Sequence, residues 1–105
     1  MTNEDFRALA LALPDATESS HRGHPDFRVR NKIFATLWPE QNRGMVKLHP
    51  EQQGLLAQAE PGSFTPVPGG WGARGATHVH LAAADAASVA NALAMAHANV
   101  LAARR

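Results

Sequence analysis

The spacing of apolar residues changes along this chain, and the change limits the folds that it can adopt. Near the N-terminus, Phe6, Leu9, Ala10 and Leu13 are spaced as i, i+3, i+4 and i+7, the pattern of one helix face. From about residue 17 to residue 49 the period falls to two, and near the C-terminus the helical period returns. This order predicts an α+β domain in which three helices pack on one side of a sheet.

Turn residues and caps divide the first half into elements. The first helix is expected over residues 3–13, with Thr2 or Asn3 as its cap and Pro14 as its end. Strands are expected around Phe27 and Val29, then at 32–38 and 44–48, with turns at 31–32 and 39–44. Short connections between consecutive strands predict an antiparallel meander.

The second half is expected to add a short helix, a loop, one strand and a long helix. Pro50 opens the short helix, which ends at Pro61. Residues 61–75 contain three prolines and five glycines, which predicts an ordered but irregular loop. A strand at 77–81 follows, and Asp85 caps a helix whose negative end suits Arg104 and Arg105.

Length and composition favour one globular domain over residues 1–105. Apolar residues make up 45% of the chain and charged residues 18%, a balance unlike that of disordered proteins. The chain has no cysteine, which excludes disulfides and thiolate metal sites. The start of the chain is acidic where a secretory signal would be basic, and we expect no membrane span. These features predict a cytoplasmic protein.

Positive charge is concentrated in one block. The net charge is +1 with neutral histidines, but residues 21–47 carry six basic and two acidic side chains and so sum to +4. The basic residues are Arg22, Arg28, Arg30, Lys32, Arg43 and Lys47. If the apolar residues of the strands face the helices, alternation sends Arg28, Arg30, Lys47, His78 and His80 to the other face. Such a face predicts weak, electrostatic DNA binding without catalysis, and the ordinary alternative is a solvated sheet surface.

A second hypothesis is a pocket for a small molecule or a protein partner. It would lie between the sheet and the segment from Pro61 to Gly75, lined by His24, Trp38 and Trp71, with His78 and His80 nearby. Both tryptophans are also candidates for the core. A flat cationic face would favour nucleic acid, whereas a deep apolar cleft with a few polar groups would favour a ligand.

Longer stretches of the sequence resemble a known family. The segments are His21-Arg-Gly-His-Pro-Asp-Phe-Arg-Val-Arg-Asn-Lys-Ile-Phe-Ala-Thr-Leu, then Val46-Lys-Leu, Pro50-Glu-Gln-Gln and Pro66-Val-Pro-Gly-Gly-Trp-Gly. They are similar to the MmcQ/YjbR family, and the Gly69-Gly70-Trp71-Gly72 stretch looks like an actinobacterial, and hence bacterial, subgroup. The resemblance implies a small α+β fold likened to a double-wing DNA-binding domain. It carries no catalytic residue over to this sequence.

Several short motifs do not indicate catalysis or a cofactor. The string Gly70-x-Gly72-x-x-Gly75 precedes a strand, whereas a dinucleotide-binding motif follows one and opens a helix. His78 and His80 share a strand face, but no spacing specifies the third ligand that zinc needs. The serines lack the context of a nucleophile elbow. We therefore expect no bound metal, no cofactor and no enzyme activity.

Overall fold

The structure, a computed structural model, describes residues 1–103, which form four helices, six strands and one 3-10 turn. In chain order these are α1 (Asn3–Leu11), β1 (Ala16–His21), β2 (His24–Val29), β3 (Lys32–Trp38), η1 (Pro39–Gln41), β4 (Arg43–Lys47), α2 (Pro50–Ala59), β5 (Phe64–Pro66), α3 (Gly70–Ala73), β6 (Ala76–His80) and α4 (Ala86–Ala103). Arg104 and Arg105, expected beside the end of the last helix, lie outside the described residues.

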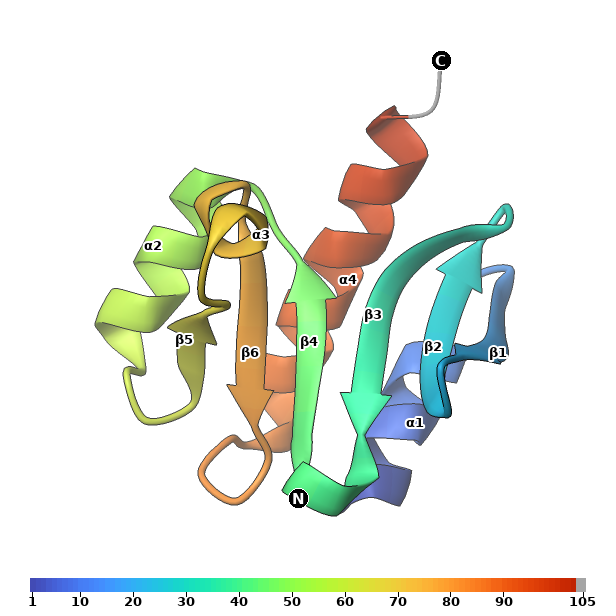
Figure 1. Cartoon of the computed structure of the whole chain (residues 1–105), viewed down its shortest axis with the longest axis horizontal. Helices are drawn as coiled ribbons and strands as arrows, with labels where there is room; N and C mark the ends of the chain where they lie inside the picture. The colour runs from blue at the N-terminus through green and yellow to red at the C-terminus, as the bar shows by residue number, and fades with distance from the viewer. Residues whose placement is uncertain (104–105) are drawn as a thin grey trace.

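The strands form one sheet in the order β1-β2-β3-β4-β6-β5 (Figure 1). Every neighbouring pair is antiparallel. The first four strands follow chain order through short turns, as the alternating pattern predicts. The chain then places β5 at the edge of the sheet, and β6 returns between β5 and β4. The predicted antiparallel α+β architecture is confirmed.

The three longer helices lie on one side of the sheet. α4 packs against β2, β3 and β4, and α1 packs against α4 and β1. α2 lies beside β5, where Gln52 Oε1 accepts a hydrogen bond of 2.7 Å from Asn99 of α4. Gly44 of β4 gives room to α1, because a Cβ there would stand 2.6 Å from the ring of Phe6. The core therefore lies between the sheet and α1 and α4.

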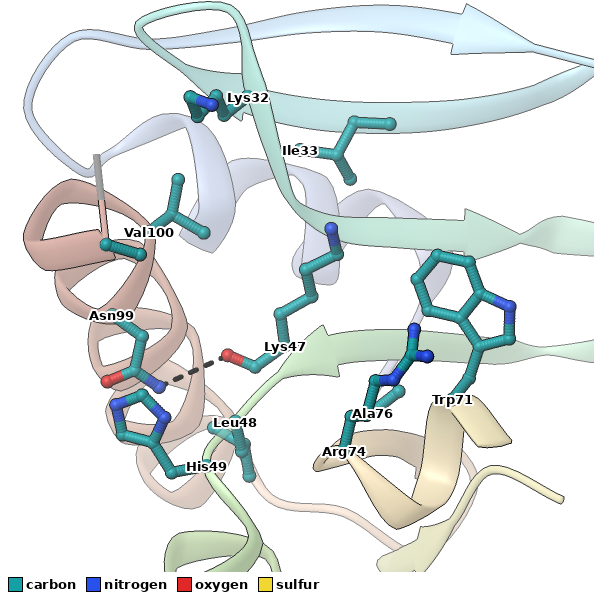
Figure 2. A pocket seen from close by; sticks show the side chains of 11 residues that line it. Lys32, Ile33, Lys47, Leu48, His49, Trp71, Arg74, Ala76, Asn99 and Val100 are labelled. Atoms are coloured by element: carbon teal, nitrogen blue, oxygen red, sulfur yellow. Dashed lines mark hydrogen bonds between the residues drawn. The ribbon is translucent and has the colours of Figure 1, made fainter. Parts of the chain in front are cut away.

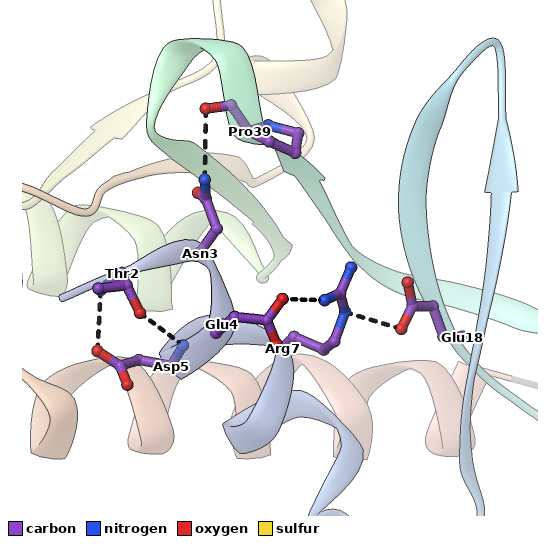
Figure 3. Close-up of polar contacts among 7 residues, drawn as sticks. All are labelled: Thr2, Asn3, Glu4, Asp5, Arg7, Glu18 and Pro39. Atoms are coloured by element: carbon purple, nitrogen blue, oxygen red, sulfur yellow. Dashed lines mark hydrogen bonds and ion pairs between the residues drawn. The ribbon is translucent and has the colours of Figure 1, made fainter.

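Polar contacts fix the start and the position of α1 (Figure 3). Thr2 Oγ1 accepts a hydrogen bond from the backbone N–H of Asp5 at 3.0 Å, and Asp5 Oδ2 accepts one from the backbone N–H of Thr2 at 2.9 Å. This reciprocal pair is a capping box, which satisfies backbone donors at the helix end. Arg7 forms ion pairs with Glu4 and, at 3.0 Å, with Glu18 of β1. Thr2 is thus the cap, and Arg7 joins α1 to the edge strand.

Two sequence-based boundaries require correction. The segment 61–75 is not wholly irregular, because it contains β5 and the single turn α3. β5 forms because Phe64 is buried in the core and its strand pairs with β6. The turn between β2 and β3 is formed by Arg30 and Asn31, whose φ angles are 52° and 66°, one residue earlier than expected. Positive φ at both positions is typical of the tight hairpin turn that matches strand twist.

α4 is a long helix rich in alanine, as the sequence predicts. Its 18 residues have a mean hydropathy of 1.3, so its length and composition suffice for a membrane span. Alanine accounts for this, because it raises mean hydropathy while it contributes little apolar area. In the described structure 28% of this stretch is buried, and Val89, Leu93 and Ala96 face the core.

An irregularity in β3 opens the sheet at one end. Phe27 pairs with Ala35 but Arg28 pairs with Ile33, so Phe34 is an additional residue on β3. A bulge of this kind bends a strand and increases its twist. Pairing between β3 and β4 runs from Trp38–Arg43 to Ala35–Val46 and extends no further in the described chain. Beyond it β3 curves away from β4, as Figure 1 shows.

Candidate cationic pocket at the split sheet

A pocket of about 320 Å³ lies where β3 and β4 separate (Figure 2). Its apolar lining comes from three elements: Ile33 of β3, Leu48 after β4 and Val100 near the end of α4. α4 contacts both strands, and in Figure 1 it passes behind β4 and rises into the gap between β4 and β3. The pocket therefore exists because the bulged strand leaves part of α4 uncovered.

Three cationic side chains line the same pocket. Lys32 comes from β3, Lys47 from β4 and Arg74 from the end of α3. The described lining contains no aspartate or glutamate. Burial lowers the pKa of the Lys47 ammonium, and the charge of Lys32 lowers it further. An anion in the pocket would relieve both effects, because it would offset the lost hydration and separate the two like charges.

Trp71 forms an aromatic wall beside these cations. Its side chain is 60% exposed, which corrects the idea that both tryptophans lie in the core. The Lys47 Nζ atom lies 5.7 Å from the centre of the Trp71 ring. Such a cation–π contact is near the outer limit of about 6 Å. The ring is therefore available to a second planar group.

Hydrogen bonds to the backbone hold the pocket walls in place. Gln53, buried on α2, donates to the carbonyl oxygens of Gly72 and Ala76, both at 2.9 Å. Asn99 Nδ2 donates to the carbonyl oxygen of Lys47 at 3.3 Å (Figure 2). These bonds join α2 to α3 and β6, and α4 to β4, beside the opening. Most of the lining residues thus belong to helices and strands, which position side chains better than loops do.

The cationic sheet face predicted by alternation is not formed as expected. Arg28 does lie on the face away from the helices, but its guanidinium binds Asp26 through two bonds of 2.8 and 3.1 Å. Asp26 is fully buried, and the bond from Arg28 holds the pKa of its carboxyl below the usual value. His21 Nδ1 lies 2.8 Å from the same carboxylate. Arg30 is in the turn outside β2, so strand alternation does not govern it.

Trp38 and three of the six histidines, His24, His78 and His80, form a separate cluster on that face. Trp38 contacts His24 at 5.3 Å and His78 at 6.3 Å between ring centres, and Arg43 stacks over it at 5.2 Å. His80 shares a hydrogen bond of 2.7 Å with Thr65 of β5. Burial lowers the pKa of His78 to about 4, and the charges of Arg43 and His80 add to the effect.

Several polar atoms in and beside this cluster are buried, although His24, Arg43 and His80 are half-buried residues. Within residues 1–103, His24 Nδ1, Thr36 Oγ1, Arg43 Nε and His78 Nδ1 are buried and have no hydrogen-bond partner. No group of three or more metal-ligating side chains occurs in the described chain. We therefore regard the cluster as packing on the second face of the sheet and the split-sheet pocket as the candidate site.

The structure brings together only some of the residues predicted for a site. Lys32, Lys47 and Trp71 meet at the pocket, although they were assigned to two different hypotheses. Arg22 lies in the turn between β1 and β2, the opposite end of the hairpin from Lys32. Arg74 was missed, and its position three residues after Trp71 is the signal that could have found it.

Fold and pocket together define a small α+β domain with one cationic, aromatic-walled site. The YjbR family model matches residues 11–99. The chain belongs to the YjbR family. A comparison with curated proteins finds no match.

The fold also matches an experimentally solved protein. The crystal structure of Deinococcus radiodurans protein DR2400, which carries the domain DUF419, superposes with a TM-score of 0.78. The two sequences are 23% identical, and the match covers 94% of this chain and 78% of the other. This likeness supports the α+β fold.

Proposed function

We propose that this chain is a non-catalytic nucleic-acid-binding domain that contacts phosphates at the split-sheet pocket. The observation that carries the proposal is the meeting of Lys32, Lys47 and Arg74 around one opening whose described lining has no carboxylate. Lysine and arginine contacts to phosphate release counterions, and this release supplies most of the affinity of non-specific nucleic-acid binding.

The pocket is a better phosphate site than the face of β2. Arg28 is already neutralised by Asp26, so a phosphate would have to compete with a buried carboxylate for it. Lys32 and Arg74, by contrast, are exposed, and Lys47 is half-buried without a carboxylate beside it in the pocket lining. We therefore propose that nucleic acid contacts the end of the sheet and not the sheet face.

Salt-dependent titration tests this assignment. We expect low-salt binding of a DNA oligonucleotide, with the slope of log affinity against log salt reduced in magnitude by about one for each of Lys32→Ala, Lys47→Ala and Arg74→Ala. Arg22→Asn is the matched control, since it removes an exposed cation at the far turn and asparagine tolerates the φ of 53° there. Loss of affinity in the control equal to that in the pocket variants would contradict the assignment.

A second candidate is a small anion with an apolar ring. The volume of about 320 Å³ and the apolar walls favour it, because small-molecule pockets begin near about 300 Å³. Benzoate and phenyl phosphate are suitable probes. A rise in melting temperature with either probe, absent in Lys47→Ala, together with no affinity for DNA at low salt, would favour this candidate over nucleic acid.

A further inference from the structure

We infer that the pocket receives one unpaired base of a nucleic-acid strand, which stacks on Trp71, so the domain selects single-stranded over duplex nucleic acid. This inference rests on the proposed function and names the form of nucleic acid that the same site takes. It is carried by the combination of an exposed aromatic ring, apolar walls and cations at one recess.

Trp71 has the properties of a stacking platform. It is the most exposed of the phenylalanine and tryptophan residues in the described chain, at 60%, although burying a tryptophan would stabilise the fold. It stands on α3, a single turn whose backbone is fixed by bonds such as Ala73 N–H to the carbonyl of Gly69 at 3.1 Å. Tryptophan faces bind any base by stacking, because every base presents a π-face.

The rest of the recess suits the shape and chemistry of a nucleotide. Ile33 and Val100 supply apolar walls for a planar ring. Lys32 and Arg74, both exposed, can bind the phosphate groups on either side of the base. Lys47 lies between these parts, and its long contact with Trp71 can be exchanged for a phosphate oxygen. One nucleotide thus satisfies the aromatic, apolar and cationic parts together.

A duplex cannot use the same contacts. Its bases are paired and stacked inside the helix, so they do not reach a recess behind the strand ends unless one is flipped out, which costs unstacking energy. A duplex would therefore contact only the cations at the opening. The binding free energy of stacking one base is large enough to give a preference of about tenfold or more for the single strand.

Fluorescence anisotropy with a labelled oligothymidine and a duplex of equal length tests the inference at low salt. We expect tighter binding of the single strand, and we expect Trp71→Ala to lower that affinity to the level of the duplex while duplex affinity stays unchanged. Trp71→Phe should retain most of the preference because it keeps a ring. Leu55→Ala is the matched control, since Leu55 is 69% exposed on α2, away from the pocket lining.

The possible outcomes separate this inference from the proposed function. Equal, salt-dependent affinity for both forms, or an equal loss for both in Trp71→Ala, would overturn the base-stacking inference and leave phosphate binding in place. No affinity for either form would overturn both. Thymidine monophosphate that competes as tightly as the oligonucleotide would also overturn the inference, because the pocket would then bind free nucleotides.

Discussion

His78 shows how a single buried side chain can make stability depend on pH. It lies on β6 in edge contact with Trp38 and is 8% exposed, and burial lowers its pKa to about 4 because it disfavours the charged form. Its ordinary pKa is 6.5, so between pH 4 and pH 6.5 the unfolded chain binds a proton that the folded chain does not. Folding is then opposed by protonation, and the free energy of unfolding rises with pH across this range.

We predict that the free energy of unfolding falls as pH is lowered from 6.5 to 4, by an amount on the order of 3 kcal/mol from His78 alone. Urea denaturation at steps of pH measures it. His78→Gln should flatten the slope in this window and leave the dependence between pH 7 and 8 as it was. An unchanged slope in the variant would show that another group is responsible. Asp26, whose pKa is lowered from 3.8, also makes the free energy of unfolding fall with pH, but mainly at pH values below this window.

Charge in the sequence and charge available for binding differ at the level of single residues. Arg28 and Lys47 contribute equally to the basic block, but Arg28 is neutralised by Asp26 two residues away and Lys47 faces an opening. Alternation places both side chains away from the helices and cannot indicate which partner each one finds. The sequence therefore predicts the excess of cations correctly and does not predict which of them are free.

At the scale of elements, Gly75 sets the approach of β6 to the end of β4. Its φ is 113°, and a Cβ there would stand 1.9 Å from the carbonyl oxygen of Leu48. Leu48 N–H donates to the carbonyl oxygen of Gly75 at 3.3 Å, so the two backbones touch beside the pocket. Only glycine fits both the angle and the distance.

We predict that Gly75→Ala lowers the free energy of unfolding by more than about 2 kcal/mol, because backbone atoms must move apart. Gly54→Ala is the matched control within α2, where a Cβ would meet nothing within 4 Å. It should raise stability by about 0.5–1 kcal/mol, as alanine favours a helix over glycine. Chemical denaturation measures both changes. Similar effects at the two positions would contradict this explanation.

Elements were predictable where they bury a periodic face. α1, α4, β3 and β4 follow the spacing of residues such as Phe6, Leu93 and Val46, which are all buried. β1 has no such spacing, since residues 17–21 are exposed, and it is a strand because its backbone pairs with β2. β5 and α3 were not predicted, because their prolines and glycines are typical of loops. Both elements depend on contacts with β6 and α2, which the sequence pattern does not show.

At the scale of the whole molecule, order should decrease from the centre of the sheet towards β1. β3 and β4 are the central strands, and α4 covers both of them. β1 is an edge strand held by β2 on one side. We predict that hydrogen exchange is slowest in the paired parts of β3 and β4 and fastest among the strand amides of β1. Equal protection of β1 and β4 in an exchange experiment would contradict this ranking.

The candidate site could be predicted only in part, because it belongs to no single element. Lys32 and Lys47 are recognisable as cations on strands, and Trp71 as an aromatic residue among glycines. Their meeting depends on the additional residue Phe34, which turns β3 away from β4. A bulge adds one residue to a strand relative to its neighbour, and the spacing of apolar residues in the sequence does not show where it occurs.

The separation of β3 from β4 also divides the sheet into two halves that are each nearly continuous in sequence. Residues 16–38 form one half and residues 43–80 the other, and the strands that join them pair only over Ala35–Trp38 and Arg43–Val46. A ligand that touches Lys32 on one half and Arg74 on the other would bridge this junction and restrict how far the halves twist against each other. Binding at the pocket would then make the entire sheet stiffer.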